Sequence, residues 1–211
     1  MLLSLKTACA VAPLLAATGV GLGYALGRMR GPWASALDFL VTLPLVFPPI
    51  ATGFLLLLLL GRRSAVGGLL EDVAGVKIVF SFWGVALASY VAGLPLIVKP
   101  VQAAVHRETG RLVEAAYVLG KSPTQTFFRV VLPSLRTSVC AGLFLALARS
   151  LGEVGVTLML GGNIQGKTNT VSLEIYNAVF TGEYDRAYAL VLVLGALSLA
   201  LVAATRRLSR E

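Results

Sequence analysis

The sequence predicts an all-α membrane protein with about five transmembrane helices, built as a single domain over residues 1–211. Its 211 residues are 57% hydrophobic and only 13% charged, whereas soluble proteins average roughly 45–50% apolar and 25% charged residues. The apolar residues also form runs of about 18 to 25 positions. At about 1.5 Å per residue, each run is long enough to cross a hydrocarbon core of roughly 30 Å.

The five apolar runs cover residues 7–26, 36–60, 80–98, 137–160 and 187–204. The first is expected to be a retained span and not a cleaved signal peptide, because Arg28 and Arg30 follow it where a small-residue cleavage site would lie. The second contains Pro44, Pro48 and Pro49, each of which removes a backbone donor, so we expect a kinked or broken helix. Protein or a water-filled cavity must then satisfy the freed carbonyls. Pro48 and Pro49 are therefore candidates for lining a pathway, and a purely structural kink is the alternative.

The positive charges predict the orientation, because short cytoplasmic loops retain lysine and arginine. An odd number of spans places the termini on opposite sides, and the rule then puts the N-terminus outside and the C-terminus in the cytoplasm. Of the 18 lysines and arginines, six fall on the outer side and Arg149 lies within a span. The cytoplasmic side would carry 11 of the 18 lysines and arginines: Arg28, Arg30, Lys99, Arg107, Arg111, Lys121, Arg129, Arg136, Arg206, Arg207 and Arg210.

Several function classes lack their sequence signals. The net charge of +8 comes without a basic tract that has interleaved aromatics, so nucleic acid is not an expected partner. Cys9 and Cys140 have neither disulfide-framework nor zinc-site spacing, and the single histidine, His106, reads as a solvated interfacial residue. No GxxxxGK[ST] pattern occurs, so ATP phosphates are not cradled by that mechanism. We therefore expect no catalytic, metal or cofactor site on this chain.

Two connections are too long for simple turns, namely residues 99–136 on the cytoplasmic side and 161–186 outside. In the first, Val113, Ala116 and Gly120 recur at helical spacing, and Gly120 can end the helix in a left-handed conformation. Ser122 can then cap a second helix with Pro123 at its first position and residues 124–131 following. The alternative is an amphipathic helix that only lies on the lipid surface.

This cytoplasmic stretch carries a recognisable pattern. Glu114, Ala115 and Ala116 are followed after three residues by Gly120, and eleven residues later by Leu132 and Pro133, with Val130 in an aliphatic position. The pattern is the EAA motif, and the chain resembles the inner-membrane permeases of binding-protein-dependent ABC importers.

The resemblance implies a type I ABC importer permease fold in which residues 107–136 form a coupling helix seated in a groove of the ATPase subunit. It also implies the partners: an ATPase dimer that holds ATP and Mg, an external substrate-binding protein and a second copy of the permease. The chain itself would be a transport subunit of a prokaryotic inner membrane, not an enzyme.

The substrate is indicated by residues 148–155, 157–159 and 162–168, which resemble the oxyanion branch of the family, and by residues 173–176, which favour molybdate permeases over sulfate ones. Val154 and Gln165 depart from the commonest form, where Phe and Pro stand. Arg149 and Glu153 are four apart in the fourth span and can pair, which reduces the cost of each charge in lipid. They are candidates for the pathway or gate, or for a structural ion pair.

The outer connection is rich in Gly, Asn and Thr and regains a helical pattern at residues 171–180. It is a candidate docking site for the binding protein through Asn163, Lys167 and Tyr176, and a packing or re-entrant helix is the alternative. The sequence thus predicts an ATP-driven importer of molybdate or tungstate. Sulfate or thiosulfate import, an ATP-independent carrier or channel and a membrane scaffold are the alternatives, and the absence of internal repeats argues against the carrier.

Overall fold

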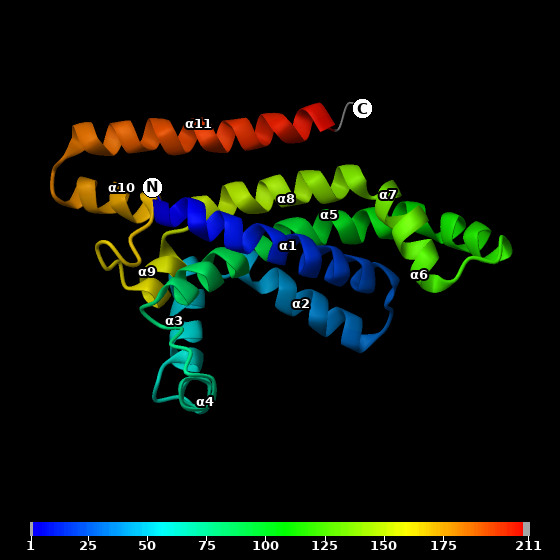
Figure 1. The fold of residues 1–211 in the computed structure, drawn as a ribbon, viewed down its shortest axis with the longest axis horizontal. Helices are drawn as coiled ribbons and strands as arrows, with labels where there is room; N and C mark the ends of the chain where they lie inside the picture. Colours follow the sequence, from blue (N-terminus) through cyan, green and yellow to red (C-terminus); the bar gives the residue numbers. More distant parts are fainter. Residues whose placement is uncertain (1, 209–211) are drawn as a thin grey trace.

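The computed structural model describes residues 2–208, and over this range the chain forms helices and no strand. Figure 1 shows the arrangement, an elongated bundle with α11 as a separate outer layer. In chain order the elements are α1 (Leu2–Arg28), α2 (Pro32–Val46), α3 (Pro49–Leu60), α4 (Ala65–Ala74), α5 (Phe82–Val118), α6 (Pro123–Thr126), the π-helical turn η1 (Phe127–Val131), α7 (Leu132–Ser134), α8 (Arg136–Leu151), α9 (Gly155–Gly161), α10 (Val171–Phe180) and α11 (Tyr184–Leu208).

Three helical segments of the described chain are long and apolar enough to cross a bilayer: Leu2–Arg28, Phe82–Arg107 and Tyr184–Ala204. The number rises to five when each of two bent pairs counts as one span. One pair joins Pro49–Leu60 to Ala65–Val73 with a bend of 56°, and the other joins Pro123–Ser134 to Arg136–Leu151 with a bend of 69°. The all-helical membrane fold with about five spans is confirmed.

The core of the bundle lies where α1 and α8 pack on α5. A stripe of glycines on α1 permits the closest approach, because a Cβ on Gly19 or Gly23 would lie 2.3 Å from Ile97 or 2.7 Å from Val101 on α5. Gly27 repeats the pattern one turn later. Small residues at four-residue spacing let helix backbones approach closely in membranes, where van der Waals packing takes over from the hydrophobic effect. The side chains of α5 thus fill the groove along α1.

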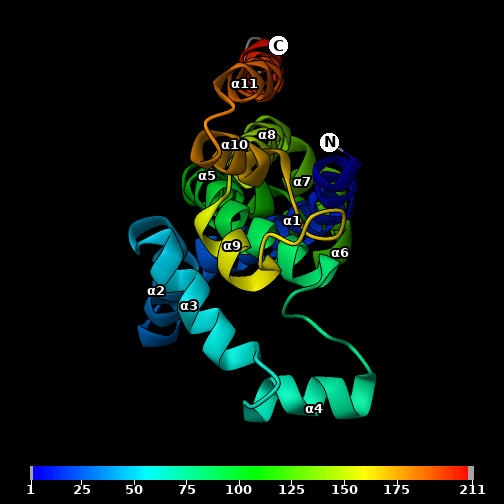
Figure 2. The same ribbon diagram turned by 90° about the vertical axis from the view of Figure 1, so that its left-hand side faces the viewer.

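The second predicted span is not a single straight helix. As the prolines predicted, α2 ends at Val46 and α3 begins at Pro49, and α3 then leaves the direction of α2 and leads away from the bundle to α4 (Figure 2). The fourth predicted span, residues 137–160, was expected to be continuous and is also broken, since α8 ends at Leu151 and α9 begins at Gly155. Gly152 follows directly after the last turn of α8, and glycine is a poor helix former.

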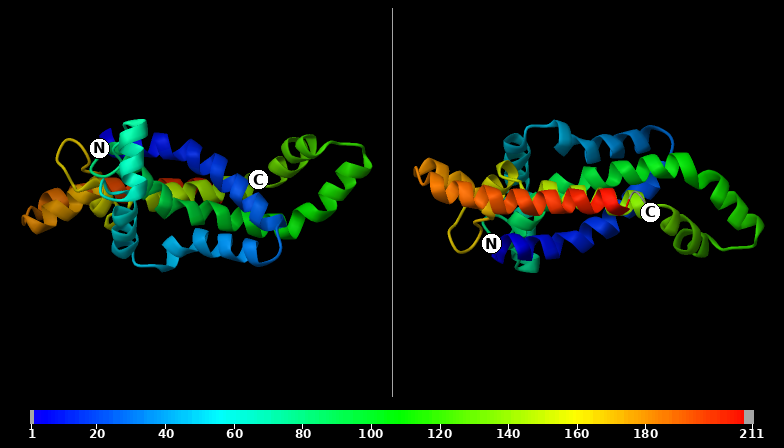
Figure 3. Two further views of the ribbon diagram at one scale, coloured as in Figure 1. Left: turned by 90° about the horizontal axis from the view of Figure 1, so that it is seen from below. Right: turned by 90° about the horizontal axis from the view of Figure 1, so that it is seen from above.

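The boundary that we placed at residue 99 lies inside a continuous helix. α5 runs without interruption from Phe82 to Val118, and its apolar portion extends to Arg107, so Lys99 belongs to the membrane-spanning part. The far end of α5 and the following α6 reach beyond the ends of the other helices (Figure 3). One continuous helix therefore joins the bundle to the stretch that carries the EAA pattern.

Candidate functional site

The two breaks in the broken spans lie against each other. Pro48 stands at the N-cap of α3 and Pro49 at its first position, and a Cβ on Gly155, the first residue of α9, would lie 2.9 Å from Cβ of Pro49. Farther along α3, a Cβ on Gly53 would lie 2.9 Å from Cα of Val156. The start of α3 therefore crosses the start of α9 at backbone contact distance.

An ion pair secures the α8–α9 break. Arg149 Nη1 lies 2.5 Å from Glu153 Oε2, so the predicted pairing is confirmed. It does not run along one helix face as expected, because Glu153 stands between the two helices. Its second oxygen, Oε1, accepts a 2.8 Å hydrogen bond from the backbone N–H of Val156 in the first turn of α9. The cation thus lies at the C-terminal end of α8 and the anion at the N-terminal end of α9, which both helix dipoles favour.

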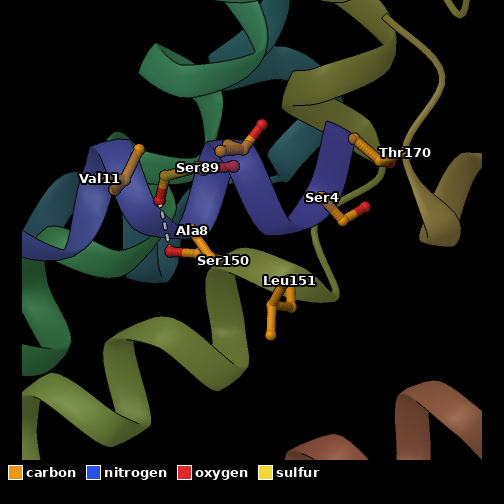
Figure 4. A pocket seen from close by; sticks show the side chains of 8 residues that line it. Ser4, Ala8, Val11, Ser89, Ser150, Leu151 and Thr170 are labelled. Atoms are coloured by element: carbon orange, nitrogen blue, oxygen red, sulfur yellow. Dashed lines mark hydrogen bonds between the residues drawn. The ribbon is translucent and has the colours of Figure 1, made fainter. Parts of the chain in front are cut away.

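A small cavity lined by hydroxyl groups lies beside this break (Figure 4). The Oγ of Ser150 donates a 2.6 Å hydrogen bond to the backbone oxygen of Ser89, and the Val171 N–H donates to Ser4 Oγ at 2.9 Å. The cavity volume of about 10 Å³ matches one water molecule. Its polar side chains come from α1, α5, α8 and the N-cap of α10: Ser4, Thr7, Ser89, Ser150 and Thr170.

The cytoplasmic motif forms the turn that its residues predicted. Gly120 has a φ of +71°, and the N–H of Lys121 donates to the oxygen of Ala116 at 3.0 Å, which closes the end of α5. Ser122 and Gln125 then form a reciprocal capping box that starts α6. Glu114, Ala115 and Gly120 are exposed, Ala116 is buried, and Leu132 and Pro133 open α7.

The tip of this segment presents apolar side chains to its surroundings. Val118 is 87% exposed, Leu119 76% and Phe128 60%. Phe127, by contrast, packs edge-on against Tyr24 of α1 with ring centroids 5.0 Å apart. The Phe127 ring therefore packs the segment against α1, and the Phe128 ring stays exposed.

The outer loop between α9 and α10 is held by an asparagine cluster. Asn163, with a φ of +52°, donates to Asn177 Oδ1 at 2.6 Å and accepts from Asn169 Nδ2 at 2.8 Å. The Asn163 amide is thus engaged within the chain, whereas Lys167 and Tyr176 are exposed.

In the first turn of α11, Arg186 pairs with both Glu174 and Glu183 and so joins α11 to α10. The hydrogen bond from Arg186, helped by one from Thr181, lowers the pKa of the Glu183 carboxyl.

Sequence reasoning missed a second membrane ion pair. Asp38 lies inside α2, and its Oδ1 is 2.6 Å from Nζ of Lys99 on α5. Gln102 Nε2 donates to the same oxygen at 2.9 Å. The available signal was an acidic residue within an apolar run, which in a membrane helix needs a partner. The described residues hold no cluster of metal-ligating side chains.

Residues 19–211 match the family of binding-protein-dependent transport system inner membrane components. The molybdenum transport system permease protein ModB of Escherichia coli is 35% identical over 100% of this chain and 94% of its own length. The sulfate transport system permease protein CysW of Synechococcus elongatus is 35% identical over 89% of this chain and 65% of its own length.

Among solved structures, a bacterial alginate ABC transporter in complex with a pentasaccharide-bound periplasmic protein has a chain with a similar fold. The TM-score is 0.74 at 18% identity, covering 100% of this chain and 77% of that one. At this identity the likeness establishes the fold alone.

Proposed function

The chain belongs to the binding-protein-dependent transport system inner membrane components, and on that premise we propose that it imports molybdate or tungstate as one of two identical permease subunits. It is the membrane-spanning permease of an ABC importer, and we infer an ABC ATPase and an external binding protein as its partners. We assign ATP and Mg to the ATPase, and the outer side to the N-terminus.

The observation that carries the coupling role is the exposed apolar tip at the far end of α5. Val118 and Leu119 lie next to the Gly120 turn, and Glu114 is exposed one helical turn before them. An exposed apolar patch rimmed by polar groups is typical of a protein interface. Seated in a groove of the ATPase, this tip would move with the ATPase, and the continuous α5 would carry the movement into the bundle.

The crossing of the two breaks supports a pathway along α2, α3 and α9. Pro48 and Pro49 leave non-helical backbone at membrane depth, which is tolerated where it lies within protein or lines a water-filled cavity. Both prolines are exposed in the single chain, so a second copy facing them would enclose a route between the two subunits. The buried Glu153 fits a structural role for its ion pair, and Arg149, whose side chain is 35% exposed, is the partner that could meet a passing anion.

The outer loop supports docking of the binding protein. In our proposal the asparagine cluster centred on Asn163 sets the shape of the loop, while Lys167 and Tyr176 make the contact because they are exposed. The proposed cargo follows from the molybdenum permease of Escherichia coli, which matches the full length of this chain. Sulfate is the second candidate, favoured by the 35% identity to the sulfate permease of Synechococcus elongatus.

The test is metal uptake, measured by mass spectrometry, in cells without their own molybdate system that express this chain with its ATPase and binding protein. Accumulation of molybdenum or tungsten that withstands excess sulfate is the expected result. Glu114→Arg should abolish it, because charge reversal at the proposed coupling site would uncouple the ATPase. The matched control is Asp72→Arg, a charge reversal at an exposed position of α4, which should import normally.

Three outcomes would change the proposal. Uptake that sulfate suppresses would move the cargo to sulfate. Uptake that persists in Glu114→Arg, or without the ATPase, would overturn the coupled mechanism. No uptake of any of these oxyanions by the assembled wild-type transporter would remove the cargo assignment and leave the family assignment intact.

A further inference from the structure

A cavity that opens to the surface lies beside the second membrane ion pair, near the end of the bundle from which the coupling segment projects. It has a volume of about 570 Å³, far more than the roughly 30 Å³ that one water molecule occupies in the liquid. Its polar lining comes from the α1–α2 loop, α2 and α5: Arg30, Ser35, Asp38, Thr42, Lys99, Gln102 and His106.

The charges of this lining favour an anion. Arg30 and Lys99 are cationic, Gln102 carries two amide donors, and among the described lining residues Asp38 is the one carboxylate. Cations in a membrane-spanning segment are costly and mark ion or substrate sites by default. Thr42 contributes little to a ligand because its hydroxyl already donates to the backbone oxygen of Asp38 at 2.6 Å.

The donors most suited to an anion are already engaged. Lys99 Nζ and Gln102 Nε2 both bind Oδ1 of Asp38, at 2.6 and 2.9 Å. The side chains of Lys99 and Asp38 are nevertheless 34% and 33% exposed, so the pair is open to the cavity and not sealed beneath other side chains. A dissolved oxyanion could therefore reach the same two donors.

We propose that Lys99 and Gln102 form an oxyanion site at the inner end of the pathway, which Asp38 occupies as a tethered competitor. The site rests on the proposed function, whose cargo is a tetrahedral dianion. An arriving oxyanion exchanges with the Asp38 carboxylate, and departure of the oxyanion restores the Lys99–Asp38 pair. The competitor keeps binding weak, which a transport pathway needs because an ion must leave as readily as it enters.

The exchange also couples helix α2 to helix α5. Asp38 lies on α2, which leads to the Pro48 break, and Lys99 lies on α5, which leads to Gly120 and the coupling tip. While Asp38 is bound, α2 is tied to α5 by an ion pair and a hydrogen bond. While the oxyanion holds Lys99, that tie is released, so passage of the cargo is accompanied by loosening of α2 from α5.

The test is equilibrium binding of molybdate and of sulfate, by titration calorimetry, to the assembled permease–ATPase complex in lipid nanodiscs without binding protein or nucleotide. Asp38→Asn keeps the side-chain shape and removes the competing charge, so oxyanion affinity should rise by up to about fivefold, the upper limit for one partly exposed charge contact. Lys99→Met should lose the binding, and Lys99→Arg should retain it because the cation is kept.

Two controls separate this site from other anion sites. Arg62→Gln removes a cation that is 80% exposed and lies outside the cavity, on the predicted outer side, and should leave binding unchanged. Binding that survives in Lys99→Met belongs to the ATPase or to another surface. Melting temperature and gel filtration confirm that each variant assembles. If Asp38→Asn does not assemble, the comparison of Lys99→Met with Lys99→Arg tests the proposed site.

Equal oxyanion affinity in wild type and Asp38→Asn, or wild-type binding in Lys99→Met, overturns the site. These outcomes are distinct from failure of the proposed function, which the uptake experiment measures on the wild-type chain. A transporter that imports molybdate, and whose variants at residues 38 and 99 bind it as wild type does, would keep its function and lose this site.

Discussion

Among the described residues, the Arg149–Glu153 pair at the α8–α9 break and the Lys99–Asp38 pair between α5 and α2 differ in accessibility more than in chemistry. In the pair at the α8–α9 break, the side chain of Glu153 is 2% exposed and both its oxygens are engaged, one by Arg149 and one by a backbone N–H. In the Lys99–Asp38 pair, both side chains are about one third exposed beside a cavity of about 570 Å³. In the first pair the carboxylate is sealed against the backbone of α9, whereas in the second both side chains border an open cavity.

The difference teaches that burial, and not the presence of opposite charges, separates a structural ion pair from an exchangeable one. A carboxylate as buried as Glu153 cannot exchange its partner for water, so loss of either partner leaves an uncompensated charge. A pair that faces water gains little net free energy, because each ion is nearly as well solvated alone. The experiments below test that contrast, beginning with the largest expected effect.

Removing the charge of Glu153 should have the largest effect. Glu153→Gln leaves Arg149 without its anion at the α8–α9 break, and breaking a buried pair in this way costs about 3–5 kcal/mol. Because the side chain of Arg149 is 35% exposed, we expect the lower end of that range. Thermal melting of the purified permease–ATPase complex in detergent measures it. Replacing both residues, as Glu153→Gln with Arg149→Leu, should recover part of the loss, and a wild-type melting temperature for Glu153→Gln would refute the structural role.

Forcing α3 and α9 apart where their first turns cross should have the next largest effect on stability. Gly155→Ala places a Cβ 2.9 Å from Cβ of Pro49 and 3.0 Å from the backbone nitrogen of Ile50, which cannot rotate away. Overpacking of this kind costs typically about 1–3 kcal/mol. The matched control is Gly195→Ala on α11, where an added Cβ meets nothing within 4 Å. We expect a lower melting temperature for the first variant only, and equal melting of the two would mean that α3 and α9 are not in close contact.

Breaking the accessible pair should change stability much less. Lys99→Met is expected to lower the melting temperature less than Glu153→Gln does, because the Asp38 carboxylate that it leaves behind is 33% exposed and keeps its hydrogen bond from Gln102. The same melting assay compares it directly with Glu153→Gln. A destabilisation as large as that of Glu153→Gln would show that the Lys99–Asp38 pair is structural, and the contrast between the two pairs would disappear.

The smallest effect concerns two buried hydroxyls. Among the described residues, Thr7 Oγ1 and Thr126 Oγ1 are buried without a hydrogen-bond partner in the protein. Thr7 lines the hydroxyl-lined cavity, which has room for one water, whereas Thr126 does not line it. Thr7→Val should therefore lower stability by about 1 kcal/mol through loss of a water contact, and Thr126→Val should leave it unchanged or raise it. A rise in melting temperature for Thr7→Val would mean that its hydroxyl has no water partner.

Features that depend on a few neighbouring residues could be predicted from the sequence. The left-handed Gly120, the cap at Ser122 with Pro123 at the next position, and α10 over residues 171–180 all match, because turn chemistry and helical periodicity act within one or two turns. The Arg149–Glu153 pair could likewise be predicted, since its members are four residues apart. The break at Gly152 was not predicted, because hydropathy stays high across it.

What the sequence determined by itself is thus the helical membrane fold, the approximate spans, the break at the prolines and the coupling turn, all of which follow from local composition and spacing. The tertiary structure alone decided that the two breaks meet, that the glycines of α1 receive α5, and that Asp38 finds Lys99, 61 positions away. The physical reason is that helix periodicity predicts which face of a helix can bury a group. Which other helix lies on that face depends on the packing of the whole bundle.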